Sequence, residues 1–444
     1  MRDLLLLAFT GVAALLAVVR PPVGLLTYVG LSILSPHSFT WGFARTFPHS
    51  QVLGLATIVG FLLWREPKRF PWMRESGLML VLWAMFGLST LMALRPDAAM
   101  SKFTLVSKLL LMTFLSMMIV NTPDRLHALV RVVALSLGIY GAKLGLFVLR
   151  WGADAPVFGP AESQLYGENA IGMAVAANIP LLVFLSRVDR ARWLRWVAAS
   201  MAVLSYPAVI GSHSRGAWVA LGIVSLLMLA KSRHRVLLIA LLIVLALVAG
   251  GWLADRLVSE RVASRFEQLV DYEDDQSAQS RFWNWEFCSR VGLARPLTGG
   301  GFDLYSLEAY ATFFPEFLDR WQGKVWSCHS MWMTMLAEHG VPGFLLWIAI
   351  LASCLWRLRR LVRVARDDDP TGRLAPLAQA LSTALVAFVV AGTFLDIGYF
   401  ESLYQVIAMT IIAGALLEKS LSPAPRPAQP APVVFRMLRA PRHD

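Results

Sequence analysis

Charged residues are scarce in this sequence, and so are the residue patterns that bind metals or nucleotides. Asp, Glu, Lys and Arg make up only 16% of the 444 residues, whereas 57% are hydrophobic. The sequence has no HExxH and no Walker or GxGxxG loop, so nothing indicates nucleotide-sugar or ATP chemistry. Its three cysteines include no CxxC pair, which argues against a metal site. We therefore expect neither a metal nor another cofactor.

The hydrophobic residues are gathered in repeated apolar runs of about 15 to 25 residues, the length that crosses a bilayer as a helix. The runs lack the alternation of a barrel strand, and backbone groups in lipid must be satisfied within the segment, so we expect helices. The net charge of +12 resides in short loops between the runs. That arrangement is typical of the positive-inside pattern and not of a nucleic-acid surface. The sequence predicts an all-α, polytopic integral membrane protein.

Counting the runs predicts about 12 transmembrane helices, or 13 if the short run Val23–Leu34 crosses fully. Strongly basic loops then all fall on one side of the membrane, the cytoplasmic side, with the C-terminus. The predicted helices are Leu4–Val19, Gln51–Trp64, Gly77–Leu94, Phe103–Val120, Leu126–Val148, Ala170–Leu185, Trp196–Ile210, Ala217–Ala230, Val236–Ala254, Val341–Trp356, Leu374–Phe394 and Ser402–Leu417.

The longest polar interruption, residues 255–328, separates N-terminal transmembrane helices (1–254) from C-terminal ones (329–420). It carries twelve acidic against eight basic residues, the opposite of the chain as a whole, which supports an outer, periplasmic loop. Residues 256–270 have the spacing of an amphipathic helix lying on the membrane. Cys288 and Cys328 lie in this loop and could pair in an oxidising compartment. The Pro-rich, basic tail 421–444 is expected to be disordered.

Isolated basic residues are the candidates for phosphate binding. Arg215 stands in the motif Ser-His-Ser-Arg-Gly-Ala-Trp, and Arg281 precedes the aromatic run Phe-Trp-Asn-Trp. A guanidinium stays charged, and its planar fork donates several hydrogen bonds to phosphate oxygens. Snorkelling to lipid head groups explains Arg215 equally well when that residue is taken alone. Lys143 and Lys108 lie inside apolar runs and are costly unless they face a cavity, and Lys143 is a lesser candidate for a second phosphate contact.

His329 opens a new apolar helix directly after the polar loop and is the candidate catalytic residue. A neutral imidazole at the membrane–water boundary can accept a proton from a hydroxyl group near neutral pH. A lone histidine is usually structural, but Glu338 follows nine residues later, and the glycine run around Gly300 allows a close backbone approach. We expect Glu338, Gly300 and Ser214 in supporting roles.

Three motifs together resemble the O-antigen ligase and O-antigen polymerase superfamily, which also contains bacterial protein O-oligosaccharyltransferases. They are SRGAW (Ser214–Trp218), SRFWNWE…RPLTGGGF (Ser280–Phe302) and HSMWMTMLAEHGVPG (His329–Gly343). Their order, their spacing and the long outer loop agree with the superfamily over roughly residues 165–345. The opening RPPVGLLTYVGLSILSPHSFTWGFA further resembles a subgroup of O-glycosylation ligases associated with exosortase systems.

The resemblance implies a GT-C-like glycosyltransferase in the bacterial inner membrane, with its active site facing the periplasm. It would move a glycan from undecaprenyl diphosphate to lipid A-core with inversion, without metal or other cofactor. Its other expected partners are membrane lipids, and no nucleic acid is expected as a partner. By this resemblance Arg215 and Arg281 correspond to the superfamily's arginines, and His329 corresponds to the histidine that opens its last motif.

The same motifs leave other acceptors and one other class open. The acceptor would be another lipid-linked glycan in a polymerase, or a protein in an O-oligosaccharyltransferase. A transporter of lipid-linked oligosaccharides also needs intramembrane basic residues and outer loops. Such a transporter typically has internal repeats or paired broken helices, and the sequence shows no convincing similarity between its halves.

Overall fold

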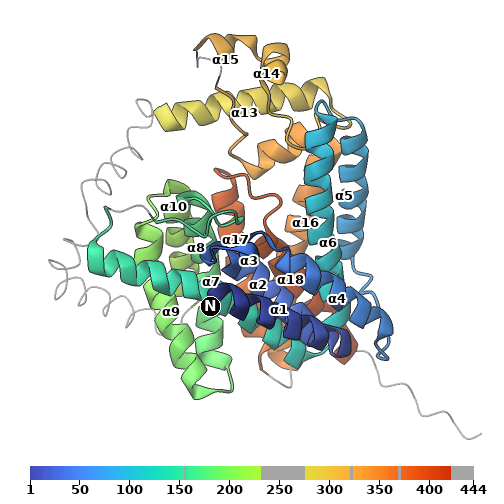
Figure 1. Cartoon of the computed structure of the whole chain (residues 1–444), viewed down its shortest axis with the longest axis vertical. Helices are drawn as coiled ribbons and strands as arrows, with labels where there is room; N and C mark the ends of the chain where they lie inside the picture. Colours follow the sequence, from blue (N-terminus) through green and yellow to red (C-terminus); the bar gives the residue numbers. More distant parts are fainter. Residues whose placement is uncertain (155–156, 232–275, 321–323, 369–371, 422–444) are drawn as a thin grey trace, which may run out of the picture.

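A computed structural model describes residues 1–154, 157–231, 276–320, 324–368 and 372–421 (Figure 1). Within these ranges the secondary structure is helical, which confirms the predicted all-α class. The helices are α1 Arg2–Val19, α2 Pro21–Leu34, η1 Pro36–Phe39, α3 Phe43–Thr46, α4 His49–Leu63, α5 Arg74–Leu91, α6 Pro96–Ile119, α7 Pro123–Trp151, α8 Glu168–Val188, α9 Arg192–Ile210, α10 Arg215–Ala230, α13 Gln276–Ala294, α14 Leu307–Phe313, α15 Pro315–Arg320, α16 Met331–Asp368, α17 Leu374–Gly392 and α18 Glu401–Leu421.

Eight of the described helices are long and apolar enough to cross a membrane, so the chain is a multi-pass helical protein. They are α1, α6, α7, α8, α9, α16, α17 and α18. The helices α2, α4 and α10 are apolar but shorter. The 14 residues of α2 span about 21 Å, less than the ~30 Å hydrocarbon core. The count of about 12 crossings stays a prediction, and the predicted helix Val236–Ala254 lies outside the described residues.

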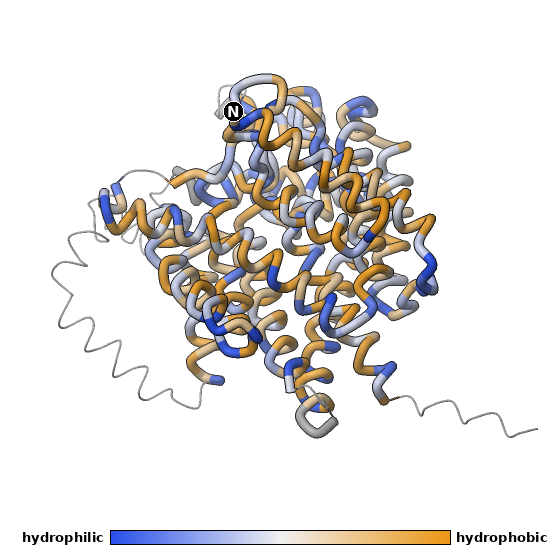
Figure 2. Tube along the Cα trace, turned by 60° about the horizontal axis from the view of Figure 1, so that its bottom comes forward, coloured by the Kyte–Doolittle hydropathy of each residue, from blue (hydrophilic) through white to orange (hydrophobic). Residues whose placement is uncertain are grey.

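Helix boundaries follow local signals. Prolines occupy the first positions of α2, α6 and α7, where a missing N–H group costs nothing. The side chain of Thr122 caps α7 by accepting a hydrogen bond from the backbone of Arg125 at 3.3 Å. In Figure 2 hydrophobic residues occur along the length of most helices, and the strongly hydrophilic ones gather at helix ends and connections. This distribution is the one expected of helices in lipid.

One buried ion pair and its hydrogen bonds link three helices of the bundle. Glu75 of α5 accepts hydrogen bonds from Arg357 of α16 at 2.9 Å and from Ser353 at 2.7 Å. Arg357 also donates to Glu418 of α18 at 3.2 Å. Because both carboxylate oxygens of Glu75 are paired, the buried charge is compensated.

The helices α13, α14 and α15 lie across one end of the bundle (Figure 1). They have a small hydrophobic core of their own, in which the rings of Phe287 and Tyr310 stack with centroids 3.7 Å apart. Cys288 and Cys328 form a disulfide bond within this cap. The part of the predicted outer loop that the structure describes is therefore largely helical. The amphipathic helix predicted at 256–270 and the tail 422–444 lie outside the described residues.

Candidate functional site

His329 lies in the connection that leads into α16, where one carboxylate holds the backbone around it. The backbone N–H groups of His329 and Ser330 each donate to Asp396 at 3.1 Å. The hydroxyl groups of Ser327 and Thr334 donate to the same carboxylate. His329 has φ of 47°, a left-handed conformation that a residue with a side chain adopts only at a cost. Asp396, from the connection between α17 and α18, thus fixes a strained turn.

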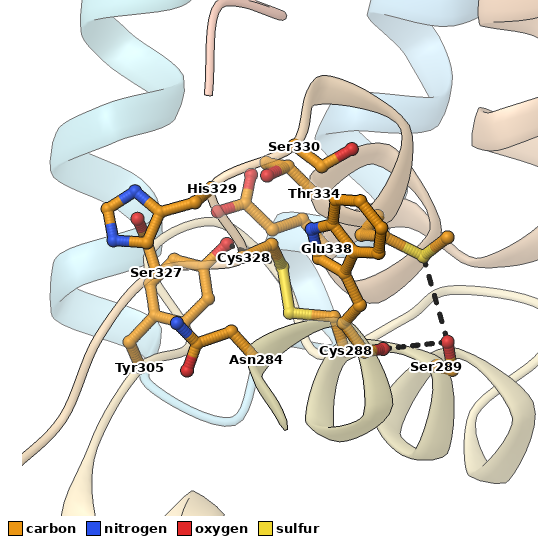
Figure 3. The surroundings of a disulfide bond; sticks show 12 residues. Asn284, Cys288, Ser289, Tyr305, Ser327, Cys328, His329, Ser330, Thr334 and Glu338 are labelled. Carbon is orange, nitrogen blue, oxygen red and sulfur yellow. Dashed lines mark hydrogen bonds between the residues drawn. A yellow bond between two sulfur atoms is a disulfide. The ribbon is translucent and has the colours of Figure 1, made fainter. Parts of the chain in front are cut away.

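The imidazole of His329 interacts electrostatically with Arg281 and Asp396. Burial lowers the pKa of His329 below its usual 6.5, the charge of Asp396 raises it, and the charge of Arg281 lowers it. A ring that is neutral at pH 7 is able to accept a proton. Figure 3 shows His329 next to the disulfide, with its ring directed away from Ser330 and Thr334. The structure therefore brings two of the predicted residues, Arg281 and His329, into one site.

The helix α13 carries Arg281 near its start, and one face of this helix is buried in the cap. The buried residues recur at helical spacing and are Asn284, Phe287, Cys288 and Val291. One turn after Arg281, the ring of Trp285 lies 6.4 Å from that of Phe394. The disulfide joins Cys288 of α13 to Cys328, the residue before His329. Arg281 and His329 are thus carried by segments that are covalently linked.

Arg215 is the first residue of α10. Ser214 caps this helix, because its side chain accepts a hydrogen bond from a backbone N–H group of the first turn at 3.3 Å. Gly216 faces Phe394: a Cβ atom at Gly216 would lie 3.5 Å from that of Phe394. The start of α10 and Trp285 of α13 therefore both pack against Phe394, which lies two residues before Asp396.

The turn formed by residues 299–301 after α13, the glycine turn, packs against a break in α16. At Gly340 the chain has φ of 67° and leaves the helical conformation, and the proline at position 342 has no N–H group to offer. The carbonyl groups of Ala337 and Glu338 instead accept hydrogen bonds from Gly300 at 2.7 Å and from Gly301 at 3.0 Å. Gly300 thus makes a backbone contact that joins two of the sequence motifs, and its supporting role in the site stays a prediction.

Glu338 belongs to a buried polar network next to this break. Its side chain is 3% exposed and accepts hydrogen bonds from the backbone of Asp303 at 3.1 Å and from the hydroxyl of Tyr399 at 2.5 Å. The same hydroxyl lies 2.6 Å from Nε2 of His339, whose Nδ1 lies 2.6 Å from the hydroxyl of Ser89. The network joins α5, α16 and the connection between α17 and α18.

Lys143, the lesser candidate, stays a prediction as a phosphate contact. It is exposed on α7, and its Nζ atom lies 4.9 Å from the centroid of the Phe39 ring in η1. Its described contact is therefore with η1 and not with α13 or the connection that carries His329.

Sequence analysis missed Asp396 and Tyr399, which lie together in the connection between α17 and α18. A signal was present, since Asp396 is the only charged residue between Arg373 and Glu401. An acid isolated between two apolar helices is costly unless it has partners. Among the residues that the structure describes, no three His, Cys, Asp or Glu side chains are grouped so that they could hold a metal ion.

Comparison with known protein families divides the chain into two parts. Residues 1–190 match a family of unknown function, DUF5935, and residues 200–348 match the O-antigen ligase family. No curated protein matches the chain. The second match includes α10, α13 and the first part of α16, and hence all three motifs. The match at residues 200–348 confirms the predicted resemblance to the O-antigen ligase superfamily.

Proposed function

We propose that this protein is a glycosyltransferase that moves a glycan from undecaprenyl diphosphate to lipid A-core. The reaction takes place at the periplasmic face of the bacterial inner membrane, in a GT-C-like helical enzyme with a cytoplasmic C-terminus. The observation that supports this proposal is that the charge of Arg281 acts on the imidazole of His329, in a region that matches the O-antigen ligase family. An anion-binding group next to a neutral base is what an acceptor hydroxyl and a diphosphate leaving group require.

In the proposed mechanism the acceptor hydroxyl oxygen attacks the anomeric carbon of the donor glycan. The bond between that carbon and the diphosphate oxygen breaks, and undecaprenyl diphosphate leaves with the electron pair. His329 takes the hydroxyl proton. Arg281, with Arg215 at the start of α10, neutralises the charge that develops on the leaving diphosphate. One displacement of this kind inverts the anomeric centre.

The supporting contacts favour His329 as the base. Asp396 fixes the backbone of His329 without a hydrogen bond to the ring, so the ring nitrogens are not consumed by that contact. Burial keeps the pKa of His329 low, so the ring is neutral at the working pH. Glu338, by contrast, is already hydrogen-bonded to Asp303 and Tyr399, which favours a positioning role for it.

The deciding experiment is reconstitution of the purified chain with undecaprenyl-diphosphate glycan. Lipid A-core is either added or omitted, and products are identified by gel and mass analysis. Product on lipid A-core supports the ligase, and elongated lipid-linked glycan without lipid A-core indicates a polymerase. In a third reaction a protein acceptor is added in place of lipid A-core. Transfer in that reaction alone indicates an O-oligosaccharyltransferase. Movement of the donor across the membrane with no new glycosidic bond would contradict the enzyme and favour a transporter.

Variants of α13 test the arginine in the same assay. Arg281→Ala is expected to lower turnover about 10²- to 10³-fold, the loss typical of one group that stabilises charge in the transition state. Arg281→Lys is expected to recover only part of it, because lysine lacks the planar fork. The matched control is Arg290→Ala on the same helix, whose guanidinium instead pairs with Glu286 at 2.6 Å and Glu316 at 3.3 Å. Equal activity of Arg281→Ala and Arg290→Ala would remove Arg281 from the site.

A further inference from the structure

A cavity of about 540 Å³ lies away from His329, among α2, α4, α6 and the start of α18. One end of it is polar and is lined by the ends of helices and a connection, at Ser32, Gln51, Gln164 and Glu401. Its other walls are hydrocarbon, supplied by Ile58 of α4 and by Leu105, Leu109 and Met112 of α6. From Gln51 to Ile58 the lining of α4 changes from polar to apolar over about 10 Å of helix. The cavity lining is therefore polar at one end and mainly apolar elsewhere, which suits an amphiphilic occupant.

Glu401 shows which head group suits the polar end. Its Oε2 atom accepts a hydrogen bond from the hydroxyl of Ser32 at 2.5 Å. Its Oε1 atom is buried and accepts no hydrogen bond from the described residues. Because the Glu401 side chain lines the cavity, an occupant that donates a hydrogen bond to its carboxyl group is favoured over one that can only accept. A sugar hydroxyl is such a donor, and a phosphate is not.

The charges along the lining also favour a hydroxylated head group over a diphosphate. Glu162 is paired with Arg45 at 2.9 Å, and burial lowers the pKa of His37, so that ring is neutral near pH 7. Glu401 and Lys108 remain as one acid and one base. Lys108 lies in the middle of α6, about 18 Å from its start, and its presence there is explained by the cavity that it lines.

The polar end is linked to the site that contains His329. The amide of Gln164 donates to the carbonyl of Tyr399 at 3.3 Å and accepts from the backbone of Glu401 at 2.9 Å. Tyr399 belongs to the connection that also supplies Asp396 to the backbone of His329, and Glu401 begins α18 directly after that connection. A head group bound at Glu401 would therefore lie next to the connection whose Asp396 holds the backbone of His329.

We infer that this cavity binds the acceptor of the proposed transfer as a glycolipid, with sugar hydroxyls at Ser32 and Glu401 and a hydrocarbon chain along Leu109 and Met112. The inference rests on the proposed function, because it takes one of the two lipid substrates of that reaction as the occupant. The acceptor suits this cavity better than the donor, because the proposed function already assigns the donor diphosphate to Arg281 and Arg215.

The test measures binding in the absence of donor. The full chain is placed in phosphatidylcholine nanodiscs with a glucosyl diacylglycerol that carries a diazirine in one acyl chain, and crosslinked peptides are mapped by mass spectrometry. Crosslinks to α4 and α6 at the cavity are expected. The same lipid without the sugar and a diazirine phosphatidylglycerol are the comparison probes, and both are expected to label the cavity at least about tenfold less.

Two cavity variants and one matched control complete the test. Met112→Trp fills space that the hydrocarbon chain needs, and Glu401→Gln removes the carboxyl group that accepts from the head group. Each is expected to lower glycolipid labelling about tenfold, which corresponds to about 1.4 kcal/mol. Met100→Trp on the same helix is the control, because Met100 is 49% exposed whereas Met112 is 4% exposed. Labelling of the cavity by all three probes alike, or unchanged labelling in Met112→Trp, would overturn the inference.

The outcome is separable from that of the proposed function. No donor is present, so binding can be positive in a chain that transfers nothing, and that result would contradict the proposed function alone. Conversely, undiminished transfer to lipid A-core by Met112→Trp would overturn the acceptor cavity and leave the proposed function standing.

Discussion

At the scale of single residues, the candidate base and the residue that holds its backbone come from two different connections, one before α16 and one between α17 and α18. His329 supplies the ring, and Asp396 receives the backbone N–H groups of His329 and Ser330. These roles can be separated experimentally, because loss of the ring removes the base whereas loss of the carboxylate alters its position and its pKa.

His329→Ala is expected to lower turnover about 10²- to 10⁴-fold, because the acceptor hydroxyl loses its base. Donor binding is expected to persist, since the arginines remain. In the wild-type chain the pKa of His329 is lowered by burial, so the ring stays neutral to below pH 6.5, and activity is expected to fall only as the pH drops through that lowered value. A pH–rate profile in proteoliposomes checks this. Recovery of most activity in His329→Gln would show that the residue only positions the acceptor.

Asp396→Asn is expected to lower turnover about 10- to 100-fold, the effect of weakening hydrogen bonds to a charged acceptor. It should also shift the pH profile. The charge of Asp396 raises the pKa of His329, so its removal lowers that pKa further and moves the acidic midpoint to lower pH. A slower variant whose midpoint is unchanged would argue that Asp396 has a structural role alone. The measurement is the pH–rate profile of the variant beside that of the wild type.

At the scale of elements, the broken helix α16 and the glycine turn depend on each other. The turn supplies donors to carbonyl groups that α16 leaves unpaired at Gly340. The approach is so close that a Cβ atom at Gly299 would lie 2.5 Å from the carbonyl oxygen of Ala337, and Gly299 has φ of 64°. Two unrelated requirements, backbone conformation and space, therefore both demand glycine there.

Gly299→Ala is expected to destabilise the protein by about 1–3 kcal/mol from backbone strain alone, before the contact with Ala337 is counted. The matched control is Gly77→Ala in α5, where an added Cβ would meet nothing within 4 Å. Alanine is expected to be neutral or stabilising at that position, because it favours a helix over glycine. Thermal unfolding of both variants in detergent checks this. Equal midpoints for Gly299→Ala and the wild type would contradict the proposed dependence.

At the scale of the whole molecule, the cap and the basic connection between α4 and α5 lie at opposite ends of α5. The last turn of α5 reaches the cap, because the carbonyl of Met92 accepts a hydrogen bond from Arg295. The other end of this 18-residue helix, about 27 Å away, follows the connection that contains Lys68. Basic residues retained in the cytoplasm would place the cap, with its disulfide, in the oxidising periplasm.

A pair of cysteine variants tests this sidedness. Glu308→Cys in α14 and Lys68→Cys between α4 and α5 replace exposed residues, and the remaining free cysteine, Cys354, is buried. A membrane-impermeant maleimide is expected to label Glu308→Cys in intact spheroplasts and Lys68→Cys only after permeabilisation. Labelling in the reverse order would overturn the predicted topology and the periplasmic site with it.

The sequence by itself determined the all-helical class, the positions of most described helices and the motifs that resemble the O-antigen ligase superfamily. These features are local, because an apolar run, a proline at a helix start or a serine cap acts within a few residues. Only the tertiary structure decided that Asp396 holds the backbone of His329, that Gly300 bonds to α16, that Lys143 contacts Phe39 and that Lys108 lines a cavity. Such contacts join residues tens to hundreds of positions apart, and no local pattern records which distant partner a polar side chain will meet once the helices have packed.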